Sequence, residues 1–148
     1  MADRAFASRA VWANLRIGRR VCARIPEALV ELDHYLRDYR TRQIQHFDPH
    51  LFDLLHDLTA SLDDSGGEID VICGYRTPWS NEFLRSRSAH TGVARQSLHM
   101  QAEAIDIRLP GISTSAVRDA ALRLRRGGVG YYRGSDFVHV DVGRIRKW

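Results

Sequence analysis

Hydrophobic residues recur at helical spacing in the first part of the chain. Pro26, followed by apolar residues every three or four positions, predicts an amphipathic helix over residues 26–42. Asp48 and Pro49 are typical of a helix start, and the apolar stripe that follows them extends to Leu62. The polar residues 63–67 are expected to end this second helix.

Beyond residue 67 the spacing changes, because apolar and polar residues begin to alternate as they do in half-buried strands. Two further helices are expected, one from Thr77-Pro78 to about Arg87 and one that Ser113 caps and that stops at Gly127-Gly128. The last two strands are separated by residues 133–136, which indicates a hairpin. This order predicts an α+β fold with a mainly antiparallel sheet. The expected strands are 68–74, 102–109, 129–132 and 137–142.

The length of 148 residues fits one domain, and a hydrophobic share of 44% supports a core. We expect an arginine-rich arm over residues 1–24 and a single domain over 25–148. No apolar run approaches the roughly 20 residues that span a bilayer, and residues 1–21 lack the apolar stretch of a signal peptide. Cys22 and Cys73 are too few for a disulfide scaffold.

The charge is basic, with 22 basic against 18 acidic residues and a formal net charge of +4. Lys147 is the sole lysine, so arginine supplies the rest. Nucleic acid, an anionic wall polymer and an ordinary surface could each explain this balance. The arginines are spread along the chain rather than clustered, which argues against nucleic acid.

Two of the expected strands carry residues that folding does not require. Asp106 is on the face opposite Ile105 and Ile107, and His99 precedes this strand on a loop. His139 and Asp141 share one face of the last strand. Two histidines and a carboxylate can hold a catalytic zinc that activates water. Ordinary structural or solvated histidines remain the alternative on this pattern alone.

The spacing Ser97-x-His99-x6-Asp106, followed by His139, resembles the signature of the lysostaphin, D-Ala-D-Ala metallopeptidase and hedgehog zinc group. More closely, residues 25–148 are similar to the MepK/YcbK-like murein endopeptidase family. Six stretches in order carry this resemblance: residues 36–40, 74–78 with Asn81, 97–101, 104–111, 126–132 and 137–141.

The resemblance implies a hedgehog/D-Ala-D-Ala-peptidase-like fold and a zinc metallopeptidase that cuts peptide cross-links in bacterial peptidoglycan. It places the Zn²⁺ ligands on His99, Asp106 and His139. Arg76 is expected to face the substrate, where a guanidinium can stabilise an oxyanion or grip a carboxylate. The substrate-binding residues that it implies are Tyr75, Arg76, Ser97 and Gln101.

Two residues are candidates for the general base. Asp136 stands three residues before the last ligand, where relatives in the wider group often have an acid, and is the first choice. Asp141 is the second choice, and its alternative role is to orient a ligand histidine.

The sequence departs from the family pattern at three places. Ala102 replaces a glycine, which is tolerated unless the backbone there needs a positive φ. Cys73 replaces the usual serine, and we expect a buried, inert thiol. The loop 88–95 is slightly longer than in relatives and is expected to shape access to the site.

The implied partner is the peptide stem of peptidoglycan, with no nucleic acid, no membrane span in this chain and a monomeric state. The substrate implies the periplasm or cell envelope. Two alternatives stay open: a peptidoglycan carboxypeptidase, and a non-catalytic wall-binding module that keeps a metal site.

Overall fold

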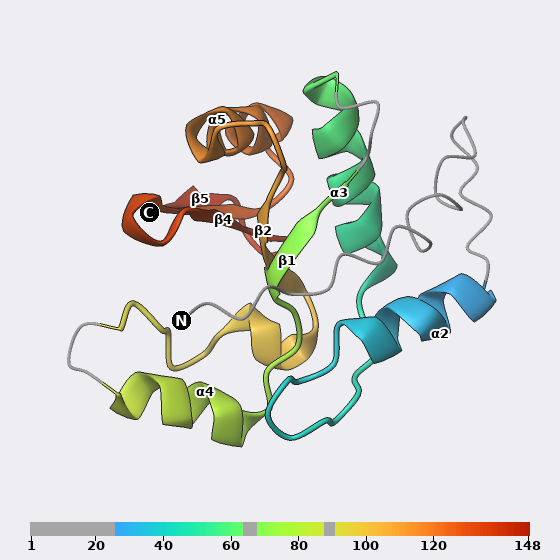
Figure 1. Ribbon diagram of the computed structural model, residues 1–148, viewed down its shortest axis with the longest axis vertical. Helices are drawn as coiled ribbons and strands as arrows, with labels where there is room; N and C mark the ends of the chain where they lie inside the picture. Colours follow the sequence, from blue (N-terminus) through green and yellow to red (C-terminus); the bar gives the residue numbers. More distant parts are fainter. Residues whose placement is uncertain (1–25, 64–67, 88–90) are drawn as a thin grey trace.

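The computed structural model describes residues 26–63, 68–87 and 91–148, so the predicted arm over 1–24 and part of the loop 88–95 lie outside the described residues. Helices surround one sheet in an α+β arrangement (Figure 1), which confirms the predicted class. The helices are α2 (Pro26–Tyr35), α3 (Pro49–Ser61), α4 (Pro78–Ser86) and α5 (Thr114–Leu124), with 3₁₀ turns η1 (Leu98–Gln101) and η2 (Arg133–Ser135). The strands are β1 (Asp70–Cys73), β2 (Ala104–Arg108), β3 (Gly128–Tyr132), β4 (Phe137–Asp141) and β5 (Arg146–Lys147).

The sheet is mixed, with the strand order β1-β2-β4-β3-β5. Neighbours from β1 to β3 pair antiparallel, and η2 joins β3 to β4 as the predicted hairpin. The edge strand β5 runs parallel to β3, however, with Lys147 opposite Val129. The prediction of a mainly antiparallel sheet is therefore wrong, because the sheet is mixed. β5 escaped prediction because two basic residues carry no alternation of apolar and polar positions.

The core lies where α3 and α5 pack together and where α5 covers β3 and β4. One face of the central strands supplies it, and these apolar side chains are almost completely buried. The opposite face of the same strands carries the polar residues of the site, so burying the apolar face fixes where the site points. The central apolar side chains are Leu51, Leu55, Leu58, Ile105, Ile107, Val117, Val138 and Val140.

The first predicted helix is too long, because α2 ends at Tyr35 rather than at residue 42. The Asp38 carboxylate accepts hydrogen bonds from the backbone N–H groups of Arg40 and Thr41, and this turn competes with a continued helix. Tyr39, which falls within the predicted helix, is consequently 70% exposed.

The other helix starts are confirmed by their caps. Asp48 accepts from the backbone N–H of His50, and Pro49 is the first residue of α3. Thr77 and Ser113 cap α4 and α5 in the same way. The predicted end of α3 is close, since the helix stops at Ser61, although residues 64–67 lie outside the described part.

Within residues 26–63, 68–87 and 91–148, every helix is too short or too polar to cross a lipid bilayer.

Candidate metal centre

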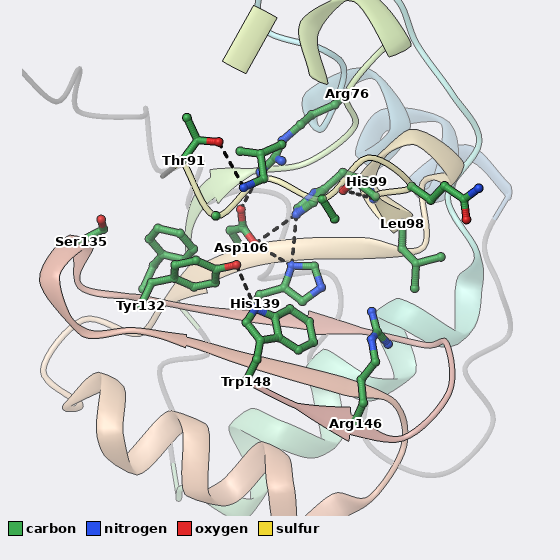
Figure 2. Close-up of a pocket in the computed structure, with 16 residues that line it drawn as sticks. Arg76, Thr91, Leu98, His99, Asp106, Tyr132, Ser135, His139, Arg146 and Trp148 are labelled. Carbon is green, nitrogen blue, oxygen red and sulfur yellow. Dashed lines mark hydrogen bonds and ion pairs between the residues drawn. The ribbon is translucent and has the colours of Figure 1, made fainter. Parts of the chain in front are cut away.

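Three side chains from different elements bring one ligand atom each to a common point (Figure 2). Asp106 on β2 lies directly opposite His139 on β4, and His99 reaches them from η1. The Asp106 Oδ1 is 3.1 Å from His99 Nε2 and 2.9 Å from His139 Nδ1, and the two nitrogens are 3.2 Å apart. All three side chains are buried. The structure thus brings together the three residues that the resemblance implies as ligands.

His99 is positioned mainly by backbone groups. The Ser97 hydroxyl accepts the His99 N–H and begins η1, and Ala102 ends the turn at φ 55°. The ring Nδ1 is 2.7 Å from the carbonyl oxygen of Gly74, which can only accept a hydrogen bond. Nδ1 therefore donates, and in the neutral ring Nε2 presents its lone pair to the other two ligand atoms.

The Ala102 backbone has the left-handed conformation that favours glycine, where the family signature has glycine. The side chain is nonetheless fully buried in the core. We expected alanine to be tolerated here unless the backbone needs a positive φ, and the structure shows that it does adopt one. This chain keeps a strained alanine in the turn that carries His99.

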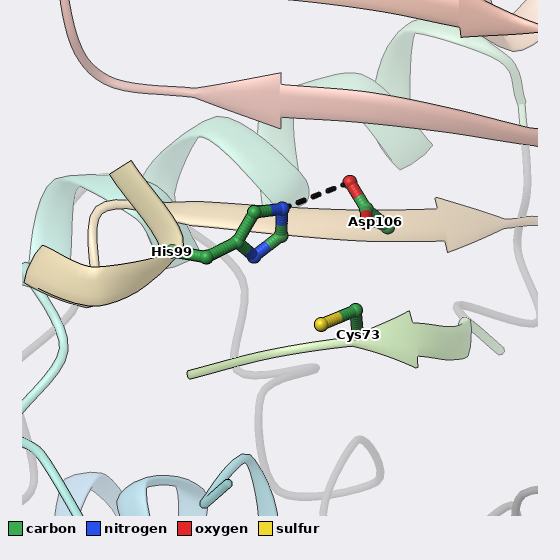
Figure 3. Close-up of side chains that lie close together, drawn as sticks. All are labelled: Cys73, His99 and Asp106. Carbon is green, nitrogen blue, oxygen red and sulfur yellow. Dashed lines mark hydrogen bonds and ion pairs between the residues drawn. The ribbon is translucent and has the colours of Figure 1, made fainter. Parts of the chain in front are cut away.

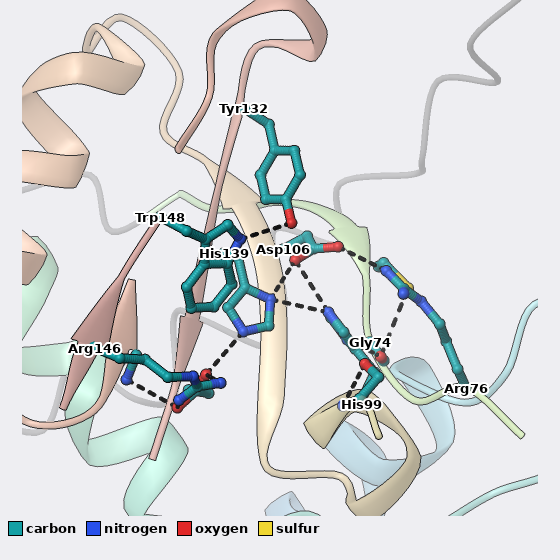
Figure 4. A network of polar contacts seen from close by, with 12 residues as sticks. Gly74, Arg76, His99, Asp106, Tyr132, His139, Arg146 and Trp148 are labelled. Carbon is teal, nitrogen blue, oxygen red and sulfur yellow. Dashed lines mark hydrogen bonds and ion pairs between the residues drawn. The ribbon is translucent and has the colours of Figure 1, made fainter. Parts of the chain in front are cut away.

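His139 is positioned by a carboxylate instead. Its Nε2 is 2.9 Å from Asp141 Oδ2, so Nε2–H donates and Nδ1 keeps the lone pair that faces Asp106 (Figure 4). Asp141 is fully buried and accepts further hydrogen bonds from the backbone of Gly128 and Gly143 and from both terminal nitrogens of Arg146. Burial alone would raise the pKa of Asp141, but these donors hold it well below its usual range.

The electrostatics of the cluster favour a positive charge beside the Asp106 carboxylate. Burial would raise the pKa of Asp106, but the two histidines hold it well below its ordinary value. Burial would lower the pKa of His99, but the Asp106 carboxylate raises it. A divalent cation can supply this positive charge, because each ring already has a partner for its other nitrogen.

Two imidazole nitrogens and one carboxylate oxygen form the ligand set that suits zinc in sites with an open position. The described residues therefore fit the Zn²⁺ that the family resemblance implies.

Cys73 lies beside the cluster, and its sulfur and the ligand atoms of His99 and Asp106 all lie within 4.8 Å of one another (Figure 3). The sulfur accepts a hydrogen bond from Arg76 Nε at 3.0 Å. Burial would raise the pKa of this thiol, but His99 and Arg76 lower it. Cys73 is half-buried rather than buried as expected, and the expectation that its thiol is inert stays a prediction. Its position next to two ligand atoms was not anticipated.

Arg76 is engaged with the cluster itself. Its terminal nitrogen is 2.9 Å from Asp106 Oδ2, and its side chain is only 12% exposed. Burial would lower the pKa of Arg76, but the neighbouring Cys73 and Asp106, with a weaker contribution from Tyr132, raise it. Arg76 lines the pocket, yet its guanidinium neutralises the second oxygen of Asp106. The backbone N–H of Arg76 also donates to the His99 carbonyl, which ties the Gly74–Arg76 turn to η1.

The ligand atoms open into a pocket of about 210 Å³ whose walls come from the loop 91–98, the β3–β4 hairpin and the C-terminal segment. Ser97 lines it, as the substrate prediction requires. Tyr75 packs against the core and Gln101 is exposed, and neither lines this pocket. The described residues that line it include Arg76, Ser97, His99, Asp106, Tyr132, His139, Arg146 and Trp148.

The structure does not bring Asp136 to the cluster. Its carboxylate accepts a hydrogen bond from the Thr114 hydroxyl at 2.9 Å, lies 3.7 Å from Arg108, and is 64% exposed. Asp141 is close, but its oxygens are occupied by His139, Arg146 and two backbone groups. The role of either residue as general base remains a prediction.

Sequence reasoning missed Gly74, Arg146, Tyr132 and Trp148 as parts of the site. Gly74 acts through its carbonyl, which no residue type reveals. Arg146 is one of two arginines near the chain end and had no distinguishing spacing. Tyr132 gave one signal, since it ends a glycine-rich strand, whereas Trp148 lies far from that strand in the sequence.

In this α+β fold, two imidazoles and a carboxylate lie at the floor of one pocket, and this is a donor set that catalytic zinc sites use. The family described as peptidoglycan L,D-endopeptidase MepK matches residues 22–148. The chain belongs to this family, which confirms the resemblance deduced from its motifs.

Two curated relatives agree with this assignment. The chain is 45% identical over 124 residues to the peptidoglycan L,D-endopeptidase MepK of Escherichia coli strain K12, covering 84% of this chain and 66% of that protein. It is 43% identical over 123 residues to the probable peptidoglycan L,D-endopeptidase MepK of Haemophilus influenzae, covering 83% of this chain and 65% of that protein. The chain thus spans less than two thirds of the length of these relatives. No solved structure matches it significantly.

Proposed function

We propose that this protein is a zinc-dependent peptidoglycan endopeptidase that hydrolyses peptide cross-links. One observation carries the proposal: three buried ligand atoms converge within 3.2 Å of one another while the other nitrogen of each histidine is already hydrogen-bonded. The names of the two relatives specify L,D-endopeptidases, so the cross-link we assign as substrate is the L,D linkage between two peptide stems.

In this proposal His99, Asp106 and His139 would hold the zinc. When bound, zinc would supply an activated water and polarise the carbonyl of the scissile bond. Arg76 neutralises the oxygen of Asp106 that faces away from the two histidines, and this keeps the carboxylate fixed and charged. Asp141 and Arg146 fix the ring of His139 so that Nδ1 points inward.

The roles of the two acidic candidates separate on their contacts. We assign Asp141 to positioning His139, because its buried oxygens already accept five hydrogen bonds from four residues. Asp136 remains the candidate proton acceptor that sequence comparison with the wider group suggests. Its exposure and its bond to Thr114 mean that such a role requires the hairpin tip to turn toward the pocket.

The proposed substrate also suggests a partner and a location. Peptide stems carry free carboxylates, which suit a chain of net charge +4. A peptidoglycan substrate places the protein in the periplasm or cell envelope. Tyr75, Arg76, Ser97 and Gln101 remain predicted substrate residues, and the monomeric state remains a prediction.

Digestion of purified sacculi tests the proposal. The protein is incubated with sacculi that contain L,D cross-links, with and without a chelator, and the muropeptides are separated. We expect cross-linked dimers to be replaced by monomers, chelation to abolish this, and added zinc to restore it. His139→Ala should abolish cleavage, whereas His56→Ala, a matched change at an exposed histidine, should leave it intact.

The other outcomes are distinct. Release of terminal D-alanine with dimers left intact would indicate a carboxypeptidase. Sacculus binding with full zinc content but no new products would indicate a non-catalytic wall-binding module. Either result would overturn the endopeptidase proposal.

A further inference from the structure

Tyr132 is the last residue of β3 and lines the pocket beside the three ligand residues. Its ring stacks on Phe137 with the ring centroids 4.5 Å apart and the planes at 16°. This stack crosses the hairpin, since Tyr132 and Phe137 are paired between β3 and β4. Figure 4 shows the hydroxyl end of Tyr132 directed toward the cluster around Asp106. The phenol therefore has a fixed direction.

The hydroxyl oxygen of Tyr132 is held by Trp148, whose indole Nε1 lies 2.9 Å from it. An indole N–H can only donate, so the tyrosine oxygen accepts this bond. The tyrosine proton is then left without an acceptor among the described residues. An accepted hydrogen bond also polarises the O–H group and makes it a better donor.

Trp148 is itself held on several sides. Its ring lies 5.1 Å from the ring of His139, and the Arg146 guanidinium lies 4.9 Å from the indole centroid. Gly130 lies beneath it, because a Cβ atom at that position would come within 2.6 Å of the indole. Backbone bonds to Val129 and Tyr131 anchor the residue along β3. The indole N–H is thereby aimed at Tyr132 before any ligand arrives.

Both arginines of the pocket already donate to protein acceptors. Arg76 donates to Asp106 and Cys73, and Arg146 donates to Asp141 and to the Arg144 carbonyl. The Trp148 N–H is used by Tyr132. Amide hydrolysis develops negative charge on the carbonyl oxygen, and a preorganised donor there is worth a large rate factor.

We propose that the Tyr132 hydroxyl donates a hydrogen bond to the carbonyl oxygen of the scissile bond as it becomes negative, with Trp148 as its positioning residue. This inference rests on the proposed function and assigns a catalytic residue to it. Hydrolysis adds a water oxygen to the carbonyl carbon and breaks the C–N bond, and the leaving amine gains a proton from that water. Tyr132 keeps its own proton throughout, so it stabilises charge and transfers nothing.

The first test removes only the hydroxyl. Tyr132→Phe keeps the ring that stacks on Phe137, and we expect kcat for dimeric muropeptides to fall roughly 100- to 1,000-fold with little change in KM. The matched control is Tyr131→Phe, because the Tyr131 ring lies against Arg118 on α5, away from the pocket. Its kcat should equal that of the unmodified protein. Zinc content, measured by elemental analysis, should be one per chain in both variants.

The second test asks whether Trp148 acts through Tyr132. Trp148→Phe keeps an aromatic ring but removes the N–H, and we expect kcat to fall about 3- to 10-fold. In the Tyr132→Phe background the same change should have no further effect on kcat. An equal loss in both backgrounds would show that Trp148 supports the site by packing alone and would overturn its positioning role.

Two measurements do not depend on turnover. The indole N–H resonance of Trp148, assigned by its loss in Trp148→Phe, should shift upfield in Tyr132→Phe because its acceptor is gone. A dimeric muropeptide with a phosphinate in place of the scissile amide should bind the Tyr132→Phe variant about 100-fold more weakly by calorimetry, in parallel with kcat.

The results separate this inference from the proposed function. If the unmodified protein does not cleave sacculi, the proposed function fails. If it cleaves and Tyr132→Phe retains kcat within about twofold, the catalytic role of Tyr132 is overturned while the endopeptidase activity stands. Loss of zinc from Tyr132→Phe would also overturn it, because the hydroxyl would then serve the metal site rather than the substrate.

Discussion

The two histidines of the cluster are both proposed as ligands, but they are supported in different ways. His99 lies in a 3₁₀ turn, and its outer nitrogen donates to a backbone carbonyl, that of Gly74. His139 lies in the middle of a central strand, and its outer nitrogen donates to a carboxylate, that of Asp141. Asp141 in turn is held by Arg146.

The site can therefore be divided into a His99 half, supported by Gly74, and a His139 half, supported by Asp141 and Arg146. Different changes should disrupt each half. The His139 half depends on side-chain chemistry, because Asp141 brings a negative charge that strengthens the imidazole as a ligand. The His99 half depends on backbone shape, because the Gly74 carbonyl must lie where the ring needs it. One half is therefore sensitive to charge and the other to steric displacement.

The largest effect should come from the side-chain half. Asp141→Asn places an amide where His139 requires an acceptor and removes the charge that pairs with Arg146. We expect zinc affinity to fall about 10- to 100-fold, measured by competition with a chromogenic chelator. Asp119→Asn, which changes an exposed carboxylate next to Arg118, should leave zinc affinity unaltered. Unchanged affinity in Asp141→Asn would remove the proposed distinction between the halves.

The backbone half can be displaced by a single methyl group. A Cβ at Gly74 would come within 2.5 Å of the Leu36 carbonyl oxygen, so the turn must shift. We expect Gly74→Ala to lower the free energy of unfolding by about 1–3 kcal/mol and to weaken zinc binding, because the acceptor of His99 moves with the turn. Gly134→Ala, where the added Cβ meets open space, is the control. Denaturant unfolding of the two variants should therefore diverge, and equal midpoints would contradict the prediction.

Asp38 supports the His99 half of the site, because it anchors the turn that follows Gly74. Its carboxylate accepts from the Thr77 backbone and hydroxyl and from the Ser80 hydroxyl. Burial alone would raise the pKa of Asp38, but these hydrogen bonds lower it from 3.8 to about 2. A depressed folded-state pKa stabilises the protein above pH 3.8, and this contribution disappears as the pH falls through 2.

The corresponding test is a pH series of unfolding free energies for the unmodified protein and Asp38→Asn. The unmodified protein should be the more stable at pH 6, and its advantage should shrink by about 2 kcal/mol on acidification to pH 2. An advantage that is the same at both pH values would show that the carboxylate charge of Asp38 contributes nothing.

The smallest effect is expected at Ala102, which ends the turn of His99 at φ 55°. Ala102→Gly relieves about 1–2 kcal/mol of backbone strain. It also loses a buried methyl group, worth about 0.8 kcal/mol, and makes the unfolded chain more flexible. These terms nearly cancel, so the unfolding free energy should change by less than about 1 kcal/mol. A loss above 2 kcal/mol by thermal or denaturant unfolding would show that the methyl dominates.

The parts of this molecule that the sequence predicted are those that side-chain type and spacing determine. Caps at Asp48, Thr77 and Ser113 fixed three helix starts, because each side chain satisfies a free backbone N–H. Alternation placed Asp106 and His139 each on the polar face of its own strand, and the structure adds that these two strands pair directly.

The parts that escaped prediction depend on tertiary contacts. The end of α2 depends on Asp38, whose partners Thr77 and Ser80 are about 40 positions away. The parallel edge strand β5 depends on pairing with β3 and has no periodic pattern of its own. The Gly74 carbonyl has no residue-type signature at all. The position of Asp136 in the sequence suggested a general base. In the structure its carboxylate is instead hydrogen-bonded to Thr114.

In the proposed metal site, the direct pairing of Asp106 with His139 across β2 and β4 makes metal binding depend on strand register. A slip of one residue between these strands would turn one of the two side chains to the opposite face. A metal ion that needs both would bind only chains with the correct register. At a free concentration one hundred times the dissociation constant, it would favour that register by about 2.7 kcal/mol. Zinc availability would then influence which fraction of the chains folds with the correct register between β2 and β4.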